Sequence, residues 1–246
     1  MVNIFNIKDK VIVFTGATGH LGKVISDHLE SEGAKVIRVS RSEKSGDMSF
    51  GLDISDDMAV QEFASQLRDR FGKIDGIVNN AYSGNTGELH NHTRDDFERS
   101  VNMSLTSPFF LIKHLLPYIN EGASIINMTS MYGMVSPDPR IYGDSGQNSP
   151  VYYGAGKAGL IQISRYLACH LSDKKIRVNS VSPGAFPNFS QEQLGGSFHQ
   201  NLENKIPLGR IGEPRDLNGV VQFLISDASL YINGINLPVD GGWTAW

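Results

Sequence analysis

The sequence predicts an α/β fold, a single domain built on a doubly wound parallel sheet of about seven strands with helices on both faces. Two observations predict it. Short, continuous apolar runs alternate with amphipathic segments along nearly the whole chain, as expected when helices bury both faces of the strands. The 246 residues, 40% of them hydrophobic, also suffice for one sizeable core. No repeat or linker divides them, so residues 1–246 are predicted to form one domain.

Composition excludes several classes of function. A formal net charge of −4 offers no basic surface for nucleic acid or an anionic membrane. The stretch Met1–Lys10 lacks a signal pattern, and no apolar run approaches the ~20 residues of a membrane span. Cys169 is the single cysteine; we expect it in the core of a protein from a reducing compartment. We therefore predict a soluble, cytoplasmic protein with neither a nucleic-acid nor a membrane partner.

The first strand and helix enclose a glycine-rich turn. The apolar run Lys10–Phe14 predicts a buried strand, and Thr15–Gly22 (TGATGHLG) leads from it into a helix that ends near Glu32. Its three glycines, at 16, 19 and 22, allow a tight turn and let backbone N–H groups approach a pyrophosphate. This arrangement predicts a Rossmann-type dinucleotide site. The alternative is a glycine-rich loop without a ligand.

The second strand suggests which dinucleotide binds. It covers Gly33–Arg41 and ends in Ser40 and Arg41, where an acidic residue would hold a ribose 2′-hydroxyl and repel a 2′-phosphate. A hydroxyl and a fork-shaped guanidinium suit a phosphate instead. We therefore predict NADP(H) in preference to NAD(H), the alternative being that Arg41 is an ordinary surface arginine.

The middle of the chain continues the alternation. A short third strand precedes Leu52–Ile54, an amphipathic helix covers Asp56–Phe71, and a buried strand covers Ile74–Ala81. Two asparagines end that strand and can bond backbone groups of neighbouring strands. His90 and His92 have no third ligand nearby, so we predict an exposed loop there and no metal site.

The next helix and strand lead to a candidate reaction centre. Asp95–Ile119 reads as one long helix that contains Asn102 and, in its interior, Pro108. The strand Ala123–Met128 then delivers Thr129 and Ser130 to the carboxyl edge of the sheet, where ligands bind in open parallel sheets. Residues 134–150 are rich in Pro, Gly, Asp and Ser, which indicates a loop.

Tyr153 and Lys157 follow on a helix that continues to about Leu171. Residues four apart share one helix face, so the ammonium of Lys157 can stabilise a Tyr153 phenolate and lower the pKa of Tyr153 toward the working pH, as a general acid/base requires. A hydroxyl from Ser130 could hydrogen-bond the reacting oxygen. By itself a Tyr-x-x-x-Lys pair is weak evidence, because most such pairs lie on solvated helix faces.

The remaining elements complete the sheet. A strand covers Lys175–Val181 and leads to Pro183-Gly184. The polar and poorly periodic stretch at 185–206 suggests a mobile flap over the substrate. A short helix covers Asp216–Ile225. A last strand covers Ile235–Val239.

Together these motifs resemble the short-chain dehydrogenase/reductase family from Lys10 to Gly242. The matching residues are Thr15–Gly22, Asp53, Asn79–Ala81, Asn102, Ser130, Tyr153, Lys157, Pro183-Gly184 and Val239–Gly242. The resemblance implies a general acid/base at Tyr153, a substrate-orienting hydroxyl at Ser130, a lysine (Lys157) that lowers the pKa of Tyr153 and holds the nicotinamide ribose, and a relay water at Asn102. It also implies that Asp53 contacts the adenine amino group and that Asn80-Ala81 line the adenosine ribose. The predicted cofactor-binding residues are Gly16, Thr18, Gly19, His20, Leu21, Ser40, Arg41, Asp53, Ile54, Asn80, Ala81, Tyr153, Lys157, Pro183, Gly184 and Phe186.

The sequence also departs from the family pattern. His20 stands where most members of this length have glycine, and the resulting spacing is more typical of longer members that act on nucleotide sugars. Tyr82 replaces the glycine of Asn-Asn-Ala-Gly, and Asn188 stands where a threonine often occurs. The 23 positions between Ser130 and Tyr153 are more than usual. The added loop carries Arg140, suited to an anionic or sugar-like substrate; an oligomer contact or a mere insertion is the alternative. The pattern loosely resembles members associated with bacterial surface-sugar or flagellin modification.

Three functions follow from the resemblance. The first is an oxidoreductase that interconverts a carbonyl and an alcohol on a small, polar, sugar-like substrate. The second is a nucleotide-sugar dehydratase or epimerase that uses the cofactor transiently, although the acidic pair usual after the catalytic hydroxyl is absent. The third is a cofactor-sensing regulator on the same fold. The resemblance further implies a homotetramer or homodimer, paired through the helices at 95–119 and 153–171, with an exposed Trp243 and Trp246 suited to a subunit contact.

Overall fold

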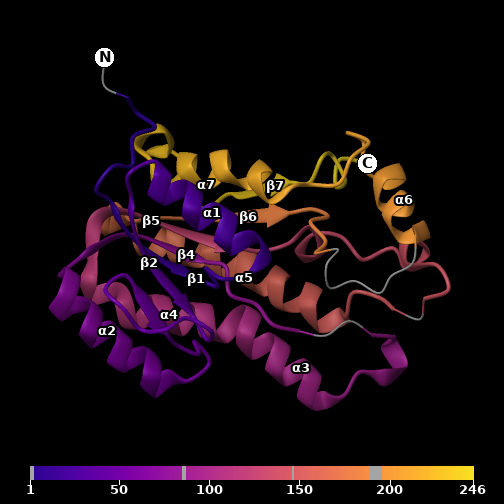
Figure 1. The fold of residues 1–246 in the computed structure, drawn as a ribbon, viewed down its shortest axis with the longest axis horizontal. Helices are drawn as coiled ribbons and strands as arrows, with labels where there is room; N and C mark the ends of the chain where they lie inside the picture. Colours follow the sequence, from indigo (N-terminus) through magenta and orange to yellow (C-terminus); the bar gives the residue numbers. More distant parts are fainter. Residues whose placement is uncertain (1–2, 85–86, 146, 189–195) are drawn as a thin grey trace.

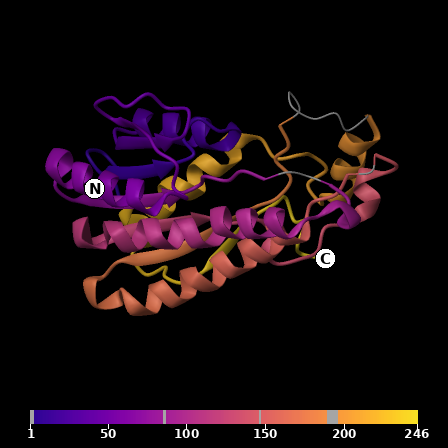
Figure 2. The same cartoon turned by 90° about the horizontal axis from the view of Figure 1, so that it is seen from below.

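A computed structural model describes residues 3–84, 87–145, 147–188 and 196–246. Its centre is a seven-stranded, wholly parallel sheet in the order β3-β2-β1-β4-β5-β6-β7. Figures 1 and 2 show helices on both faces of this sheet. The strands are β1 (Val11–Thr15), β2 (Lys35–Ser40), β3 (Ser49–Gly51), β4 (Ile74–Asn79), β5 (Ile119–Met128), β6 (Arg177–Pro183) and β7 (Asn236–Val239). The predicted doubly wound α/β fold is confirmed.

The helices form two layers. They are α1 (His20–Ser31), α2 (Asp57–Phe71), α3 (Arg94–Val101), α4 (Ser107–Leu115), α5 (Val151–His170), α6 (Gly196–Lys205) and α7 (Asn218–Ile225). One apolar cluster joins α2, α4 and α5 to one face of the sheet, and a second joins α1 and α7 to the other. Successive side chains of β1 point to opposite faces of the sheet, so this strand contributes to both clusters. Val13 belongs to the first cluster, and Ile12 and Phe14 belong to the second.

The predicted long helix at 95–119 is wrong as a single element. It divides into α3, a five-residue π-helical segment at Asn102–Thr106, and α4, and Ile119 already belongs to β5. Pro108 lies in the first turn of α4, where its missing N–H costs nothing, whereas in a continuous helix it would break the hydrogen-bond ladder. In the π-helical segment the Ser107 N–H bonds the carbonyl of Asn102 instead.

The helix within 185–206 packs against the described part of the inserted loop at 134–150. The predicted flap contains α6, and the inserted loop contains a 3₁₀ turn at Pro139–Tyr142. Ile141 from the loop joins Phe198 and Leu202 of α6 in a third apolar cluster that also holds Trp243. Gly196–Lys205 of the flap therefore form a helix, whereas 185–188 have no regular structure and 189–195 lie outside the described residues.

Several smaller predictions are also wrong. Trp243 is 3% exposed, whereas Cys169 lies on the outer face of α5 and is exposed. The sixth strand begins at Arg177 rather than Lys175, because Lys175 takes a left-handed conformation with φ of 55°. Among the described residues no helix has the length and apolar character needed to cross a bilayer.

Candidate active site

A cleft with a volume of ≈ 930 Å³ lies along the carboxyl edge of the sheet. The segments that follow β1, β2, β4, β5 and β6 line it, because parallel strands end at the same edge. Its volume is at the upper end of the range for ligand pockets, ~300–1,000 Å³. The cleft therefore has room for a dinucleotide together with a small substrate.

The glycine turn leaves backbone where side chains would obstruct a ligand. Gly16 has a φ of 70°, and a Cβ on it would lie 2.8 Å from the Cα of Ala81. A Cβ on Gly22 would overlap the carbonyl oxygen of Gly16. Asn80 fixes the turn by donating to the Thr15 and Gly16 carbonyls at 3.3 and 3.2 Å. The turn and the start of α1 form a cradle that fits a pyrophosphate.

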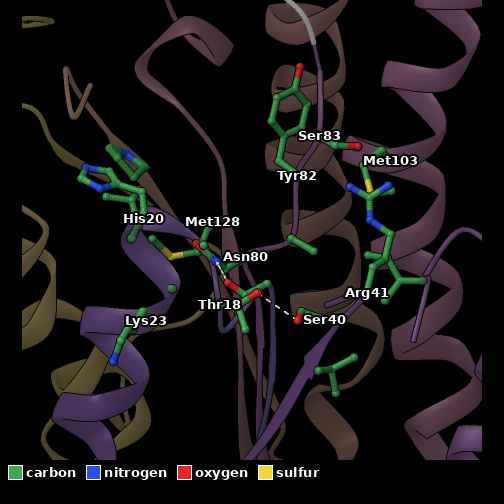
Figure 3. Close-up of a pocket in the computed structure, with 18 of the residues that line it drawn as sticks. Thr18, His20, Lys23, Ser40, Arg41, Asn80, Tyr82, Ser83, Met103 and Met128 are labelled. Atoms are coloured by element: carbon green, nitrogen blue, oxygen red, sulfur yellow. Dashed lines mark hydrogen bonds between the residues drawn. The ribbon is translucent and has the colours of Figure 1, made fainter. Parts of the chain in front are cut away.

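Hydroxyls and one guanidinium surround the end of β2. The Thr18 hydroxyl donates to Ser40 at 3.0 Å and lies 3.0 Å from the hydroxyl oxygen of Ser42. Figure 3 shows Thr18 beside Ser40, and Arg41 farther along the same wall near Ser83 and Met103. A guanidinium and a group of hydroxyls fit a ribose phosphate in charge and hydrogen bonding.

Asp53 forms the floor of this end of the cleft. Its carboxylate accepts hydrogen bonds from the backbone N–H and the hydroxyl of Ser55, at 2.9 and 2.7 Å. Burial alone would raise the pKa of Asp53, but the Ser55 hydrogen bonds and the charge of Arg41 outweigh it and leave that pKa below its usual value. Asp53 is thus an ionised hydrogen-bond acceptor at neutral pH.

Ser130, Tyr153 and Lys157 meet at the inner end of the cleft. Ser130 follows β5, and Tyr153 lies in the first turn of α5. Gly133 and Gly154 allow the two segments to approach, since a Cβ on Gly154 would lie 2.8 Å from the Tyr132 carbonyl oxygen. The Ser130 hydroxyl hydrogen-bonds the Tyr153 phenol. The three residues that the sequence singled out are therefore neighbours in space.

The charges at this end differ from the prediction. Burial raises the pKa of Tyr153, against the opposing hydrogen bond with Ser130, rather than Lys157 lowering it. Lys157 is 4% exposed, its ammonium donates to the Met128 carbonyl at 2.7 Å, and burial lowers its pKa to about 8. Desolvation penalises the charged forms of both groups. The ammonium points at a backbone carbonyl instead of the phenol, which explains the difference.

Comparisons with known proteins agree with this geometry. A family profile described as Enoyl-(Acyl carrier protein) reductase matches residues 16–244. A 3-oxoacyl-[acyl-carrier-protein] reductase of Thermotoga maritima is 30% identical, with 96% of this chain and 98% of the relative covered. The chain belongs to the short-chain dehydrogenase/reductase family. It is therefore an oxidoreductase of a family that uses nicotinamide cofactors.

Two further relatives indicate the range of the family. A short-chain dehydrogenase from Leptospira borgpetersenii, solved with bound NAD+, is 31% identical with a TM-score of 0.88, and the match covers 99% of this chain and 96% of that one. A 2-dehydro-3-deoxy-D-gluconate 5-dehydrogenase of Formosa agariphila is 29% identical over 98% of this chain and 95% of the relative.

Nearly all the predicted site residues line the cleft. Every predicted cofactor-binding residue does so, as do Ser130, Tyr153 and Lys157. Asn102 does not; it lines an adjoining pocket of ≈ 340 Å³ together with Arg41 and Asp53. The Asn102 carbonyl accepts the Ser107 N–H at the π-helical segment. The interruption between α3 and α4 therefore decides the position of Asn102.

Some lining residues were missed in the sequence. Ser42, Ser83 and Met103 also line the cleft. Ser42 and Ser83 directly follow motif residues, which is a signal that could have identified them. Met103 directly follows Asn102 and offers the same signal, although it lines the cleft and Asn102 does not. Among the described residues no group of three His, Cys, Asp or Glu side chains gathers as a metal site would.

The inserted loop contributes differently from the hypothesis for Arg140. The guanidinium of Arg140 pairs with Asp138 through bonds of 2.9 and 2.8 Å and is 86% exposed. It lines a separate surface pocket near Trp246 rather than the large cleft. Asp138 also accepts from Lys205 of α6 at 2.9 Å. Arg140 is therefore neutralised within the loop by Asp138 rather than directed into the cleft.

Proposed function

We propose that this member of the short-chain dehydrogenase/reductase family is an NADP(H)-dependent oxidoreductase that interconverts a carbonyl and an alcohol on a small, polar, sugar-like substrate. The meeting of Ser130, Tyr153 and Lys157 at the inner end of a dinucleotide-sized cleft carries the proposal. A phenol, a hydroxyl and a buried ammonium are the groups that carbonyl reduction requires beside a hydride donor.

Each residue has a proposed role. The nicotinamide, when bound, supplies the hydride for reduction or accepts it in oxidation. Tyr153 gives its proton to the carbonyl oxygen during reduction, and a raised pKa keeps that proton available at neutral pH. Ser130 donates a hydrogen bond to the same oxygen and polarises the carbonyl. Lys157 favours the phenolate that remains after the proton has left.

The preference for NADP(H) rests on the end of β2. Thr18, Ser40 and Ser42 form a group of hydroxyls there, and Arg41 carries the fork-shaped cation that a 2′-phosphate needs. Arg41 has no salt bridge to a carboxylate among the described residues, so its donors are free to meet an added phosphate. The residues proposed to bind the cofactor are Gly16, Thr18, Gly19, His20, Leu21, Ser40, Arg41, Asp53, Ile54, Asn80, Ala81, Tyr153, Lys157, Pro183, Gly184 and Phe186.

The character of the substrate is inferred from the site. Tyr82, Ser83 and Asn188, whose side chains carry hydroxyl or amide groups, are among the residues that line the cleft. Such groups recognise hydroxyls rather than long alkyl chains. The likeness to a relative named as a 2-dehydro-3-deoxy-D-gluconate dehydrogenase supports a polar substrate. Arg140 makes no part of this proposal.

We further propose a cytoplasmic homotetramer or homodimer. Phe97 of α3, and Val151 and Tyr166 of α5, are exposed apolar side chains on neighbouring helices. Figure 2 shows α5 running alongside α3 and α4, which follow one another end to end across one face of the molecule. A surface of this kind suits a subunit contact. The one cysteine, without a partner for an intrachain disulfide, suits a reducing compartment.

The test is a turnover assay with a matched pair of variants. Purified protein is given NADPH and a panel of polar ketones and aldoses, and oxidation of the cofactor is followed by its absorbance. On a substrate found in this way, Tyr153→Phe is expected to lower kcat by roughly 10²–10⁴ because it removes the transferable proton. Affinity for NADPH should change little. Near-normal turnover by Tyr153→Phe would overturn the proposed chemistry.

A further inference from the structure

Tyr82 lies against the predicted catalytic pair, at a position where the family pattern has glycine. It follows Asn80-Ala81 at the end of the β4 segment and lines the cleft, and Figure 3 shows its ring standing above Asn80 on the wall of the cleft. The centroid of this ring lies 4.7 Å from that of Tyr153, with the planes at 57°. The two rings are thus in direct contact.

The same ring faces the buried ammonium. The Nζ atom of Lys157 lies 5.4 Å from the Tyr82 centroid and 5.8 Å from the Tyr153 centroid. Both distances are within the ~6 Å range in which a cation is attracted to the face of an aromatic ring. Tyr82 therefore contacts both Tyr153 and Lys157. Neither its neighbours in the sequence nor its side-chain type predicts these contacts.

The ring is fixed in place from two sides. The Tyr82 hydroxyl lies 3.5 Å from that of Ser100, which is buried in α3. Gly84 provides the space, because a Cβ there would overlap the Tyr82 hydroxyl. A residue that was only a surface substitution for glycine would have no need of such a recess. The orientation of the ring toward Lys157 is thus set by its surroundings.

Lys157 needs such a contact because it lacks a counter-ion. Within the described ranges no carboxylate lies within salt-bridge distance of its ammonium, and the polar partner is the carbonyl of Met128. A buried ammonium without a carboxylate loses its proton more easily than one in water. The face of a desolvated aromatic ring offsets part of that cost by attracting the charged form alone.

We propose that Tyr82 is a positioning residue for the reaction, whose ring keeps Lys157 charged and holds it beside Tyr153. This rests on the proposed function, in which Tyr153 is the acid/base. A charged Lys157 stabilises the phenolate of Tyr153, so the ring acts on the reaction through these two groups. Removal of the ring face should therefore raise the pH at which Tyr153 loses its proton during alcohol oxidation.

Other titratable groups surround Tyr153 and Lys157. Tyr153 interacts with the phenols of Tyr142, Tyr132 and Tyr82 and with the Ser130 hydroxyl. Burial raises the pKa of Tyr82 to about 12 and that of Tyr132 still further, so both stay protonated throughout an assay at pH 6–10. Within the described residues, no carboxylate perturbs the pKa of Tyr153 or of Lys157.

The experiment measures the pH dependence of kcat for alcohol oxidation in the full-length enzyme, Tyr82→Phe and Tyr82→Leu. Phenylalanine keeps the ring face and loses only the hydroxyl, whereas leucine keeps apolar bulk and loses the face. We expect Tyr82→Phe to follow the unmodified profile. In Tyr82→Leu the acid limb should move up by about one pH unit, with kcat about ten-fold lower below that limb and KM for the alcohol nearly unchanged.

Three outcomes would overturn the proposal. Superimposed profiles for Tyr82→Leu and the unmodified enzyme would show that the ring face does not act on the pair. An equal shift in Tyr82→Phe would assign the effect to the hydroxyl. Failure of both Tyr82→Leu and Tyr82→Met to fold, judged by thermal melting, while Tyr82→Phe folds would make the ring a packing element only.

Tyr153→Phe separates this test from that of the proposed function. If Tyr153→Phe retains normal turnover, the assigned acid/base is wrong and the inference falls with it. If Tyr153→Phe is inactive and the Tyr82→Leu profile is unshifted, the function stands and the role of Tyr82 alone fails. NADPH binding, followed by fluorescence, should be similar in all four proteins and serves as the control for an intact cleft.

Discussion

Lys157 carries a charge in an almost fully buried position, with a pKa lowered to about 8 from 10.5. Above pH 8 the folded state releases its proton while the unfolded state keeps it until about pH 10.5, so this group makes folding more favourable as the pH rises through that window. Below pH 8 both states are protonated and the cost of burying the charge is at its full value. The residue therefore lowers stability at neutral pH.

From this we predict that, at pH 7, the free energy of unfolding of Lys157→Met exceeds that of the unmodified protein by on the order of 1–3 kcal/mol. The lost hydrogen bond to Met128 offsets part of this gain. The gap between the variant and the unmodified protein should shrink as the pH rises from 8 to 10. Urea unfolding at several pH values measures it. Lys8→Met, at an exposed position, is the control and should show no such gap. A Lys157→Met protein that is less stable at pH 7 would contradict the argument.

Arg41 governs the predicted choice of cofactor. We expect the unmodified protein to bind NADPH more tightly than NADH by about 1.5–3 kcal/mol, the range for hydrogen bonds to a charged group. Arg41→Ala should remove most of that difference and leave the affinity for NADH unchanged. Fluorescence titration with both cofactors measures it, with Arg68→Ala on the exposed face of α2 as control. Equal affinities in the unmodified protein would end this assignment.

At the scale of elements, a buried chain of polar side chains joins β4, β5 and α5. The Asn79 amide donates to Asn127 at 2.8 Å, and the Asn127 amide donates to the Ser164 hydroxyl at 2.8 Å. All three residues are buried. The sequence suggested that the asparagines at 79 and 80 bond neighbouring backbone, which is right for Asn80 and wrong for Asn79. These hydrogen bonds couple β5, the strand that Ser130 follows, to α5, the helix that carries Tyr153.

Asn127→Leu should therefore lower the free energy of unfolding by about 1–3 kcal/mol, because it leaves buried donors and acceptors without partners. Urea denaturation gives the value, and an unchanged slope would show that the denatured state is unaffected. Gln66→Leu removes a hydrogen bond on the exposed face of α2 and is the control. A loss below 0.5 kcal/mol (about the effect of a surface substitution) would refute the coupling.

The inserted loop and α6 form a second coupled pair of elements. Asp138 is held by Arg140 and Lys205, and the hydrogen bond from Arg140 is the largest cause of a pKa well below the usual value. Lys205 also lies over the ring of Trp243 at 5.5 Å. The bond from Lys205, rather than the exposed Arg140, ties the loop to the helix.

We accordingly expect Arg140→Ala to leave kcat/KM on the genuine substrate unchanged within about two-fold, since its guanidinium lies outside the cleft. Asp138→Asn should have the larger effect, raising KM, because it weakens the link between the loop and α6 beside the reaction centre. Steady-state kinetics of both variants decide between them. A rise in KM confined to Arg140→Ala would restore the idea that this arginine binds substrate.

For the whole molecule, we predict assembly into a dimer or a tetramer through the exposed side chains of α3 and α5. Light scattering at micromolar concentration should give the mass of a dimer or a tetramer. Tyr166→Glu puts a charge on the exposed face of α5. This variant should shift the measured mass toward that of the monomer, because an unpaired charge is costly in an interface. Met58→Glu on α2, at a position more open to solvent than Tyr166, is the control. A monomeric unmodified protein would refute the proposal.

The sequence by itself determined the fold class, most of the element order and more than half of the lining of the cleft. The reason is topological: in a parallel sheet each strand ends at the same edge, so motifs that follow successive strands converge without further information. The residues after β1, β2, β4, β5 and β6 needed only a correct assignment of their strands. Their local patterns supplied it.

Only the tertiary structure decided where side chains without a local pattern lie and what they touch. Trp243 is buried by residues of α6 and the inserted loop, and Lys205 of α6 donates to Asp138 of the loop. Burial raises the pKa of Tyr153, where spacing alone predicted a lowered one. The ring of Tyr82 reaches Lys157 only because α3 and α5 meet beside it. Contacts and desolvation depend on residues far apart in the chain, and no spacing within a motif encodes them.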